Sequence, residues 1–285
     1  KHLIDQALSR AQGFVEEGRP EDAIPVALQA LQLSAHVYGT SSVPLLHAYL
    51  LLAQASVGIG NLPQAAKYLS EAQWIVLQTP DCSAAMQSKL QRGLGLFCAA
   101  EGNFDQAMYH LASDVYLSAS VFGLKSLEVS KGYFHMANIF SQQNKLDIAN
   151  SLYAEVTASW HAWLLGALQA RERALRALRE ASPFTEEEEE EGIEEEMTGA
   201  QRAEATRVLQ AVLEVMEQAP APLPGDTAQV LHALAMLHYL GHDLAKAREV
   251  GMKAFNLAKQ LPQQDPLESI GHLLELIDAK FSHTN

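Results

Sequence analysis

The chain has 285 residues, of which 48% are hydrophobic and 19% charged, and its formal net charge at pH 7 is −14. With 20 Lys and Arg residues it lacks the density of positive charge that neutralises phosphates, which argues against a nucleic-acid partner. No apolar run reaches about 18 residues, so a membrane span and a membrane partner are not expected.

Small residues recur every 42 positions through the first half of the chain. Two series share this interval: Ala11, Ala53, Gly95 and Ala137, and, twelve positions later, Ala23, Ala65, Ala107 and Ala149. A Gly or Asn stands between the two members of each pair: Gly18, Gly60, Gly102 and Asn144. These residues take the left-handed conformation that ends a helix. Each period therefore predicts two helices joined by a turn, and their repetition predicts a solenoid.

The small residues would let paired helices approach closely, so that larger neighbours interdigitate. The pattern resembles the tetratricopeptide repeat. The third period carries the family's marks in register: Gly95, Gly102, Phe104, Ala107, Leu111 and, where the family has alanine, Asp114. The resemblance implies an all-α, right-handed superhelical solenoid of about six repeats with a C-terminal capping helix. At 42 residues each, the repeats are longer than the usual length of about 34.

Residues 1–165 are expected to hold repeats 1 to 4, and residues 166–285 repeats 5 and 6, in one continuous solenoid. An acidic insertion at 183–197 is expected to stay disordered, because adjacent carboxylates repel and bury nothing; docking onto a basic surface is the alternative. Helices are expected near 163–180 and 198–218. A sixth repeat with Ala235 and Ala247 at its small positions follows the connector 219–225, and a terminal helix at 265–281 would cover the last groove.

Motifs of catalysis are absent from the sequence: there is no G-x-S-x-G, no P-loop and no G-x-G-x-x-G after a strand. We therefore expect no enzyme and no cofactor. His238 and His242 are four apart, but a predicted turn at Gly241 separates them and no Cys or Asp completes a ligand set, so no metal is expected. The three tryptophans are expected to be packing residues, with peptide binding as the alternative: Trp74, Trp160 and Trp163.

In the tetratricopeptide family the first helix of each repeat lines a concave groove. Six groove positions of the third and fourth repeats form the candidate partner-binding site: Lys89, Arg92, Leu96, Lys131, Phe134 and Asn138. The three basic residues, of which Arg92 and Lys131 are expected to be exposed, predict a site for an acidic or carboxylate-bearing partner. Asn138 would hold a backbone group, and Leu96 and Phe134 would supply apolar contact. Three solvated charges are the alternative.

Several runs further resemble the repeat region of the zinc finger MYND-domain proteins of motile cilia and sperm flagella. They include Ala-Tyr-Leu-Leu-Leu-Ala-Gln-Ala-Ser-Val-Gly at 48–58 and Tyr-His-Leu-Ala-Ser-Asp-Val-Tyr at 109–116. The likeness covers roughly residues 10–165, and the cysteine-rich finger has no counterpart in this sequence. It implies a non-catalytic scaffold in the cytoplasm, in the cytoskeleton of the axoneme, with another tetratricopeptide protein and an inner-arm dynein as partners. The alternative is a cytosolic cargo or chaperone adaptor similar to kinesin light chain, which shares the 42-residue period.

Overall fold

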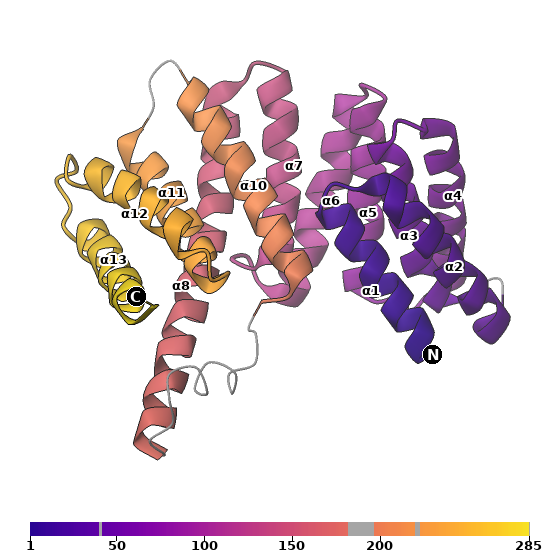
Figure 1. Ribbon diagram of the computed structural model, residues 1–285. Helices are drawn as coiled ribbons and strands as arrows, with labels where there is room; N and C mark the ends of the chain where they lie inside the picture. The colour runs from indigo at the N-terminus through magenta and orange to yellow at the C-terminus, as the bar shows by residue number, and fades with distance from the viewer. Residues whose placement is uncertain (40–41, 182–196, 220–222, 285) are drawn as a thin grey trace. The chain divides into compact units, whose positions relative to one another are not determined.

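The computed structural model describes residues 1–39, 42–181, 197–219 and 223–284. Regular secondary structure in these ranges is entirely α-helical, which confirms the expected fold class (Figure 1). The helices are α1 (His2–Glu16), α2 (Pro20–Tyr38), α3 (Val43–Gly58), α4 (Leu62–Gln78), α5 (Ala84–Ala100), α6 (Phe104–Phe122), α7 (Leu127–Gln142), α8 (Leu146–Ala181), α10 (Gly199–Gln218), α11 (Pro224–Leu240), α12 (Leu244–Ala258) and α13 (Asp265–Thr284). The expected acidic insertion at 183–197 lies outside the described residues, apart from the buried Met197.

The helices form two compact units, Lys1–Val156 and Thr157–Asn285. In the first unit, α1 packs against α2, α3 against α4 and α5 against α6, and each pair contacts the next through α2 and α3, α4 and α5, and α6 and α7. In the second unit α11 packs against α10, α12 and α13. Within each unit, neighbouring helices are thus stacked in chain order, as a repeat architecture requires.

The small residues of the 42-residue register lie at the helix contacts. Those of both series are buried, as are their counterparts in the later repeats: Ala11, Ala53, Gly95, Ala137, Ala23, Ala65, Ala107, Ala149, Ala205, Ala235 and Ala247. A Cβ atom at Gly95 would lie 2.8 Å from Cγ of Leu111 and 3.3 Å from the carbonyl oxygen of Ala107. The backbones of α5 and α6 therefore approach too closely for a larger residue at this point.

Left-handed residues end the first helices, as predicted. Gly18, Gly60 and Gly102 have φ angles of 73°, 76° and 79°, and Asn144 has 58°. In the sixth repeat the same place is taken by His242, with φ 61°. The following helices are capped in a repeated way, because Asn61, Asn103 and Asp243 each accept a hydrogen bond from the backbone N–H three residues on: Gln64, Gln106 and Lys246.

One expected helix boundary is wrong. The sequence predicts a helix that begins near 163 and ends near 180, but α8 runs from Leu146 to Ala181 without interruption. Residues 157–165 contain no Gly, Pro or Asn that would end a helix, and apolar residues continue at helical spacing. Tyr153, Val156, Trp160 and Leu164 form one buried stripe along α8.

The later boundaries agree with the sequence. Helix α10 starts at Gly199 behind a capping box, in which the Thr198 hydroxyl accepts from the N–H of Gln201 and the Gln201 side chain accepts from the N–H of Thr198. Helix α13, the expected terminal helix, begins at Asp265 and packs against α12 and α11.

Candidate partner-binding surface

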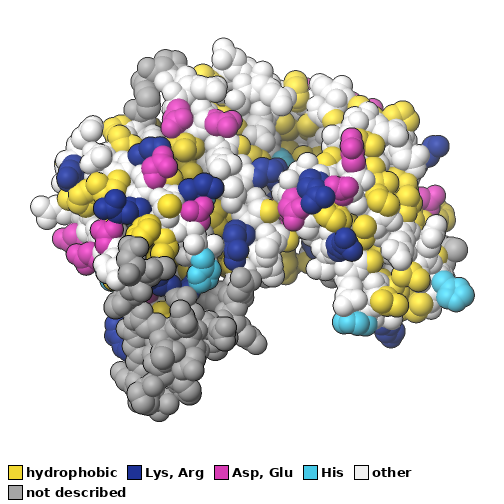
Figure 2. Space-filling model, viewed as in Figure 1, with side chains coloured by type: hydrophobic (Ala, Val, Ile, Leu, Met, Phe, Trp, Pro, Cys, Tyr) yellow, Lys and Arg dark blue, Asp and Glu magenta, His cyan; other side chains and the backbone are white. Residues whose placement is uncertain are grey.

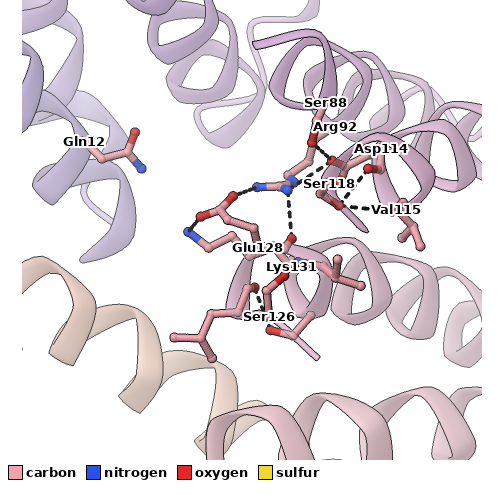
Figure 3. A network of polar contacts seen from close by, with 12 residues as sticks. Gln12, Ser88, Arg92, Asp114, Val115, Ser118, Ser126, Glu128 and Lys131 are labelled. Carbon is pink, nitrogen blue, oxygen red and sulfur yellow. Dashed lines mark hydrogen bonds and ion pairs between the residues drawn. The ribbon is translucent and has the colours of Figure 1, made fainter. Parts of the chain in front are cut away.

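A buried carboxylate occupies the centre of the predicted groove region. Asp114, on α6, has a side chain that is 0% exposed, and Arg92 on α5 approaches it with two nitrogens of its guanidinium, Nε and Nη2 (Figure 3). Nε of Arg92 lies 2.8 Å from Oδ2 and donates to it, while Nη2 donates to Oδ1 at 3.1 Å. The Ser88 hydroxyl also donates to Oδ1. Two-point pairing of this kind is the strongest common ion-pair geometry.

The same arginine reaches α7. Its Nη1 pairs with the carboxylate of Glu128 at 3.3 Å, and its Nη2 donates to the backbone oxygen of Glu128 at 3.0 Å. Nζ of Lys131 lies 3.2 Å from the other oxygen of Glu128. Burial acts to raise the pKa of Glu128, but the charges and hydrogen bonds of Lys131 and Arg92 hold it below its usual value. Arg92 therefore links α5, α6 and α7.

The neighbouring residues are small where the carboxylate needs room. A Cβ atom at Gly132 would lie 2.6 Å from Cγ2 of Val115 and 3.1 Å from Oδ2 of Asp114. The acid at position 114, where the family has alanine, is thus matched by its neighbours. Ser88 donates a hydrogen bond to it, and Gly132 leaves room for its carboxylate.

The predicted exposure of Arg92 and Lys131 is wrong for Arg92, whose side chain is only 12% exposed because its acidic partners enclose it, and the side chain of Lys131 is only 22% exposed. Lys131 is paired with Glu128, and Lys89 is half-buried. Lys89 lies close enough to His47 for its charge to lower the pKa of that imidazole. The structure therefore does not gather three free cations, and a role of these residues in partner binding stays a prediction.

The other three groove candidates are also enclosed to different degrees. Phe134 is buried and packs on Tyr153 with ring centroids 6.2 Å apart. The Tyr153 hydroxyl donates to Oδ1 of Asn138 at 2.7 Å, so this amide oxygen, expected to meet a partner's backbone, is already used within the protein. Leu96 is half-buried.

His47 gives the first unit a pH dependence. Burial, and then the charge of Lys89, lowers its pKa from 6.5 to about 4. Between these values the unfolded chain binds a proton that the folded chain rejects, so the stability is complete above about pH 6.5 and falls as the pH drops toward 4. We expect a loss of about 2 kcal/mol at about pH 5, from 1.36 kcal/mol per pKa unit. Urea denaturation of His47→Gln should show a smaller loss between pH 7 and 5 than wild type, whereas His36→Gln, at an exposed site, should match wild type.

Three large aromatic side chains on α4 and α6 are exposed, including one tryptophan that the sequence predicts to be a packing residue. Trp74 on α4 is 55% exposed, and Tyr109 and Tyr116 on α6 are 67% and 75% exposed. The packing assignment is wrong for Trp74, but it is confirmed for Trp160, which is 2% exposed. We call Trp74, Tyr109 and Tyr116 the outer aromatic set.

The outer aromatic set follows the repeat register. Each member stands two residues after a buried position, namely Ala72, Ala107 or Asp114. Two residues turn a helix by about 200°, so these side chains point away from the helix contacts. Trp74 and Tyr116 are 42 positions apart and are therefore equivalent in successive repeats. The helical period alone could have predicted their exposure.

Charged side chains at the surface are mixed in sign. Figure 2 shows basic, acidic and hydrophobic side chains interspersed on the viewed face. Several basic residues pair with acids close by: Arg19 with Glu17 and Asp22, Lys246 with Asp243, Arg248 with Asp278, and Lys253 with Glu249. Alternating charge of this kind is typical of solvated helices.

The residues that the structure describes include neither a metal-binding cluster nor a membrane-spanning helix. In these ranges no group of three or more His, Cys, Asp or Glu side chains is arranged to hold a metal ion. Nor does any described helix combine the length and hydropathy that a membrane crossing requires.

No protein-family model matches the sequence. Among solved structures, the chain is similar to a Rap protein complexed with Competence and Sporulation Factor, with 14% identity, a TM-score of 0.50, and coverage of 99% of this chain and 66% of that one. It is also similar to the TPR-like repeats of a putative kinesin light chain from P. anserina, with 13% identity, a TM-score of 0.43, and coverage of 91% and 97%. BtubC from P. vanneervenii matches with 16% identity, a TM-score of 0.40, and coverage of 90% and 91%. At 14% identity and a TM-score of 0.50, the likeness to the Rap protein concerns the fold alone. The described helices form the all-α, tetratricopeptide-like repeat fold that the 42-residue register predicted.

Proposed function

We propose that this chain is a non-catalytic scaffold that binds other proteins, and that the outer aromatic set of the first unit is its main docking surface. The observation that carries the proposal is the exposure of Trp74 and Tyr116, which are equivalent in successive repeats, together with that of Tyr109 on the same helix as Tyr116. Leaving such rings in water is unfavourable, and Trp and Tyr are enriched among the residues that dominate protein interfaces. Leu77, on the same helix as Trp74 and 75% exposed, adds apolar area.

The proposed location is the axoneme of a motile cilium or flagellum. Support comes from the sequence runs at 48–58 and 109–116, and from Gly-Tyr-Phe-His-Met-Ala-Asn-Ile-Phe at 132–140. They resemble the repeat region of zinc finger MYND domain-containing protein 12. Under this proposal the partners are another tetratricopeptide protein and an inner-arm dynein. A cytosolic cargo or chaperone adaptor is the competing proposal.

The groove formed by first helices remains a second candidate surface. Lys89 is its best probe, because Arg92 and Lys131 both belong to the Glu128 ion-pair network. Reversing Arg92 to Glu would remove the cation that pairs with the buried Asp114 and add one more acid beside it, so that variant tests folding and not docking.

The test uses the full chain added to detergent-extracted axonemes from which the endogenous protein has been depleted. We expect wild type to be retained, and Trp74→Ser with Tyr116→Ser to be released, because a buried interface aromatic typically contributes 2 kcal/mol or more, about a thirtyfold change in affinity. Lys89→Glu separates the groove from this surface, and Gln73→Ser, at an exposed site next to Trp74, is the matched control. All variants should keep the helical circular dichroism of wild type.

The outcomes distinguish the proposals. Release by Lys89→Glu alone would move docking to the groove. The adaptor proposal would be favoured, and the axonemal location contradicted, if wild type did not bind axonemes but captured soluble partners in a way that depends on Trp74 and Tyr116. Retention of every variant on axonemes would contradict docking through either the outer aromatic set or the groove.

A further inference from the structure

The second unit contains a cavity of about 410 Å³. Its walls come from α8, α11, α13 and the segment before α13, and its principal lining residues are His161, Asp226, His232, Leu261, Asp265 and Ile270. Pockets for small organic ligands typically measure about 300–1,000 Å³. This space is therefore large enough for a small ligand or for one long side chain of a partner.

Two histidines form one wall of the cavity. Nε2 of His161 lies 3.0 Å from Nδ1 of His232, and the two rings meet edge to face. His232 is 3% exposed, and its Nε2 has no hydrogen-bond partner among the described residues. Burial lowers the pKa of both rings, with that of His232 at about 3, lowered further by His161. Both imidazoles are therefore uncharged at neutral pH.

The formal charge of the lining is negative. With the histidines neutral, it comes from Asp226 in the first turn of α11 and Asp265 at the start of α13. No Lys or Arg is among the described lining residues. The two helix N-termini together offset roughly one unit of this charge, since each carries about half a positive charge. A negative lining remains, next to apolar surface from Leu261 and Ile270.

We propose that the cavity of the second unit binds a primary alkylammonium group, such as a lysine side chain or a small aliphatic amine. The ammonium would donate to the carboxylates of Asp226 and Asp265, and the methylene stem would contact Leu261 and Ile270. An ammonium has three donors and no acceptor, which matches a lining rich in acceptors. In the tautomer in which Nδ1 of His232 donates to His161, Nε2 of His232 is one more acceptor. The proposal is independent of the docking surface in the first unit.

The test is a titration of the whole chain with n-butylammonium and with Nα-acetyl-lysine methylamide, followed through the imidazole signals of His161 and His232 by nuclear magnetic resonance. We expect saturable shifts of both rings at millimolar ligand, and none with 1-pentanol, which has similar length but no charge. Asp226→Asn with Asp265→Asn should weaken binding at least tenfold, as expected for a lost hydrogen bond to a charged group. Tighter binding of the lysine derivative would assign the site to a polypeptide, and equal or tighter binding of butylammonium to a free amine.

Glu268→Gln is the matched control, because Glu268 is an exposed acid in the first turn of α13 that does not line the cavity. It should bind as wild type does. Should the double Asn variant unfold, Gln229→Glu, which adds a carboxylate to the lining, should tighten binding severalfold. Unmoved histidine signals, equal binding of 1-pentanol, equal weakening by Glu268→Gln, or a preference for zinc over both amines would each overturn the proposal.

Discussion

Replacing Arg92 by methionine should lower the free energy of unfolding of the first unit by about 3–5 kcal/mol, because it leaves the carboxylate of Asp114 buried without its cationic partner. Methionine has a similar length and keeps the apolar contacts of the arginine stem, so the loss of stability would measure the effect of removing the positive charge. Urea denaturation measures the total, and hydrogen exchange should show the loss of protection in α5, α6 and α7, the helices that Arg92 joins.

Two comparisons separate charge from packing. Adding Asp114→Ala, which restores the alanine of the repeat pattern, should recover most of the lost stability, since removing both members of a buried pair costs far less than removing one. Arg248→Met breaks an equally short pair, 2.7 Å from Asp278, but both of its side chains are more than half exposed, so its effect should stay below about 1 kcal/mol. A double variant as unstable as Arg92→Met would show that shape, and not charge, holds this contact.

The Arg92 network could not be predicted from single positions of the sequence, because it joins residues of three helices. The register identifies Asp114 as a departure from the family's alanine and places Arg92 in the groove, but the two are 22 positions apart, and the 42-residue period does not relate them. A buried acid needs a cation. The pairing of Asp114 with Arg92 and Ser88, and the room that Gly132 leaves beside it, depend on the contact of three helices. Only the packed structure supplies that contact.

Local features were predictable because local chemistry determines them. Gly18, Gly60 and Gly102 end helices through their own backbone freedom, and Thr198 with Gln201 caps α10 through contacts three residues apart. The repeat register predicted a helix beginning near 163, whereas residues 157–165 contain no helix-ending residue and α8 continues through them. Exposure of Trp74 was readable from the helical period. The pairing of His161 with His232, 71 positions apart, was not.

The second large effect is expected at the contact between α5 and α6, where small residues of the 42-residue register face each other. Ala107→Leu should lower the free energy of unfolding of the first unit by about 3 kcal/mol, the upper part of the usual range for overpacking. Ala107 is fully buried, and its backbone faces Gly95. A Cβ atom added at Gly95 would lie only 3.3 Å from the carbonyl oxygen of Ala107. Leucine cannot be accommodated by a side-chain rotation there, so α5 and α6 must separate. Because neighbouring repeats share interfaces, the loss should extend to α7 and be visible there by hydrogen exchange.

Ala112→Leu supplies the matched control on the same helix. Ala112 is exposed, and leucine is as good a helix former as most residues, so the substitution should change stability by no more than about 0.5 kcal/mol. The contrast between the two leucines depends only on which side of α6 faces α5. An unchanged melting temperature for Ala107→Leu, or equal losses for both variants, would mean that the small residues of the 42-residue register are not what sets the spacing of these helices.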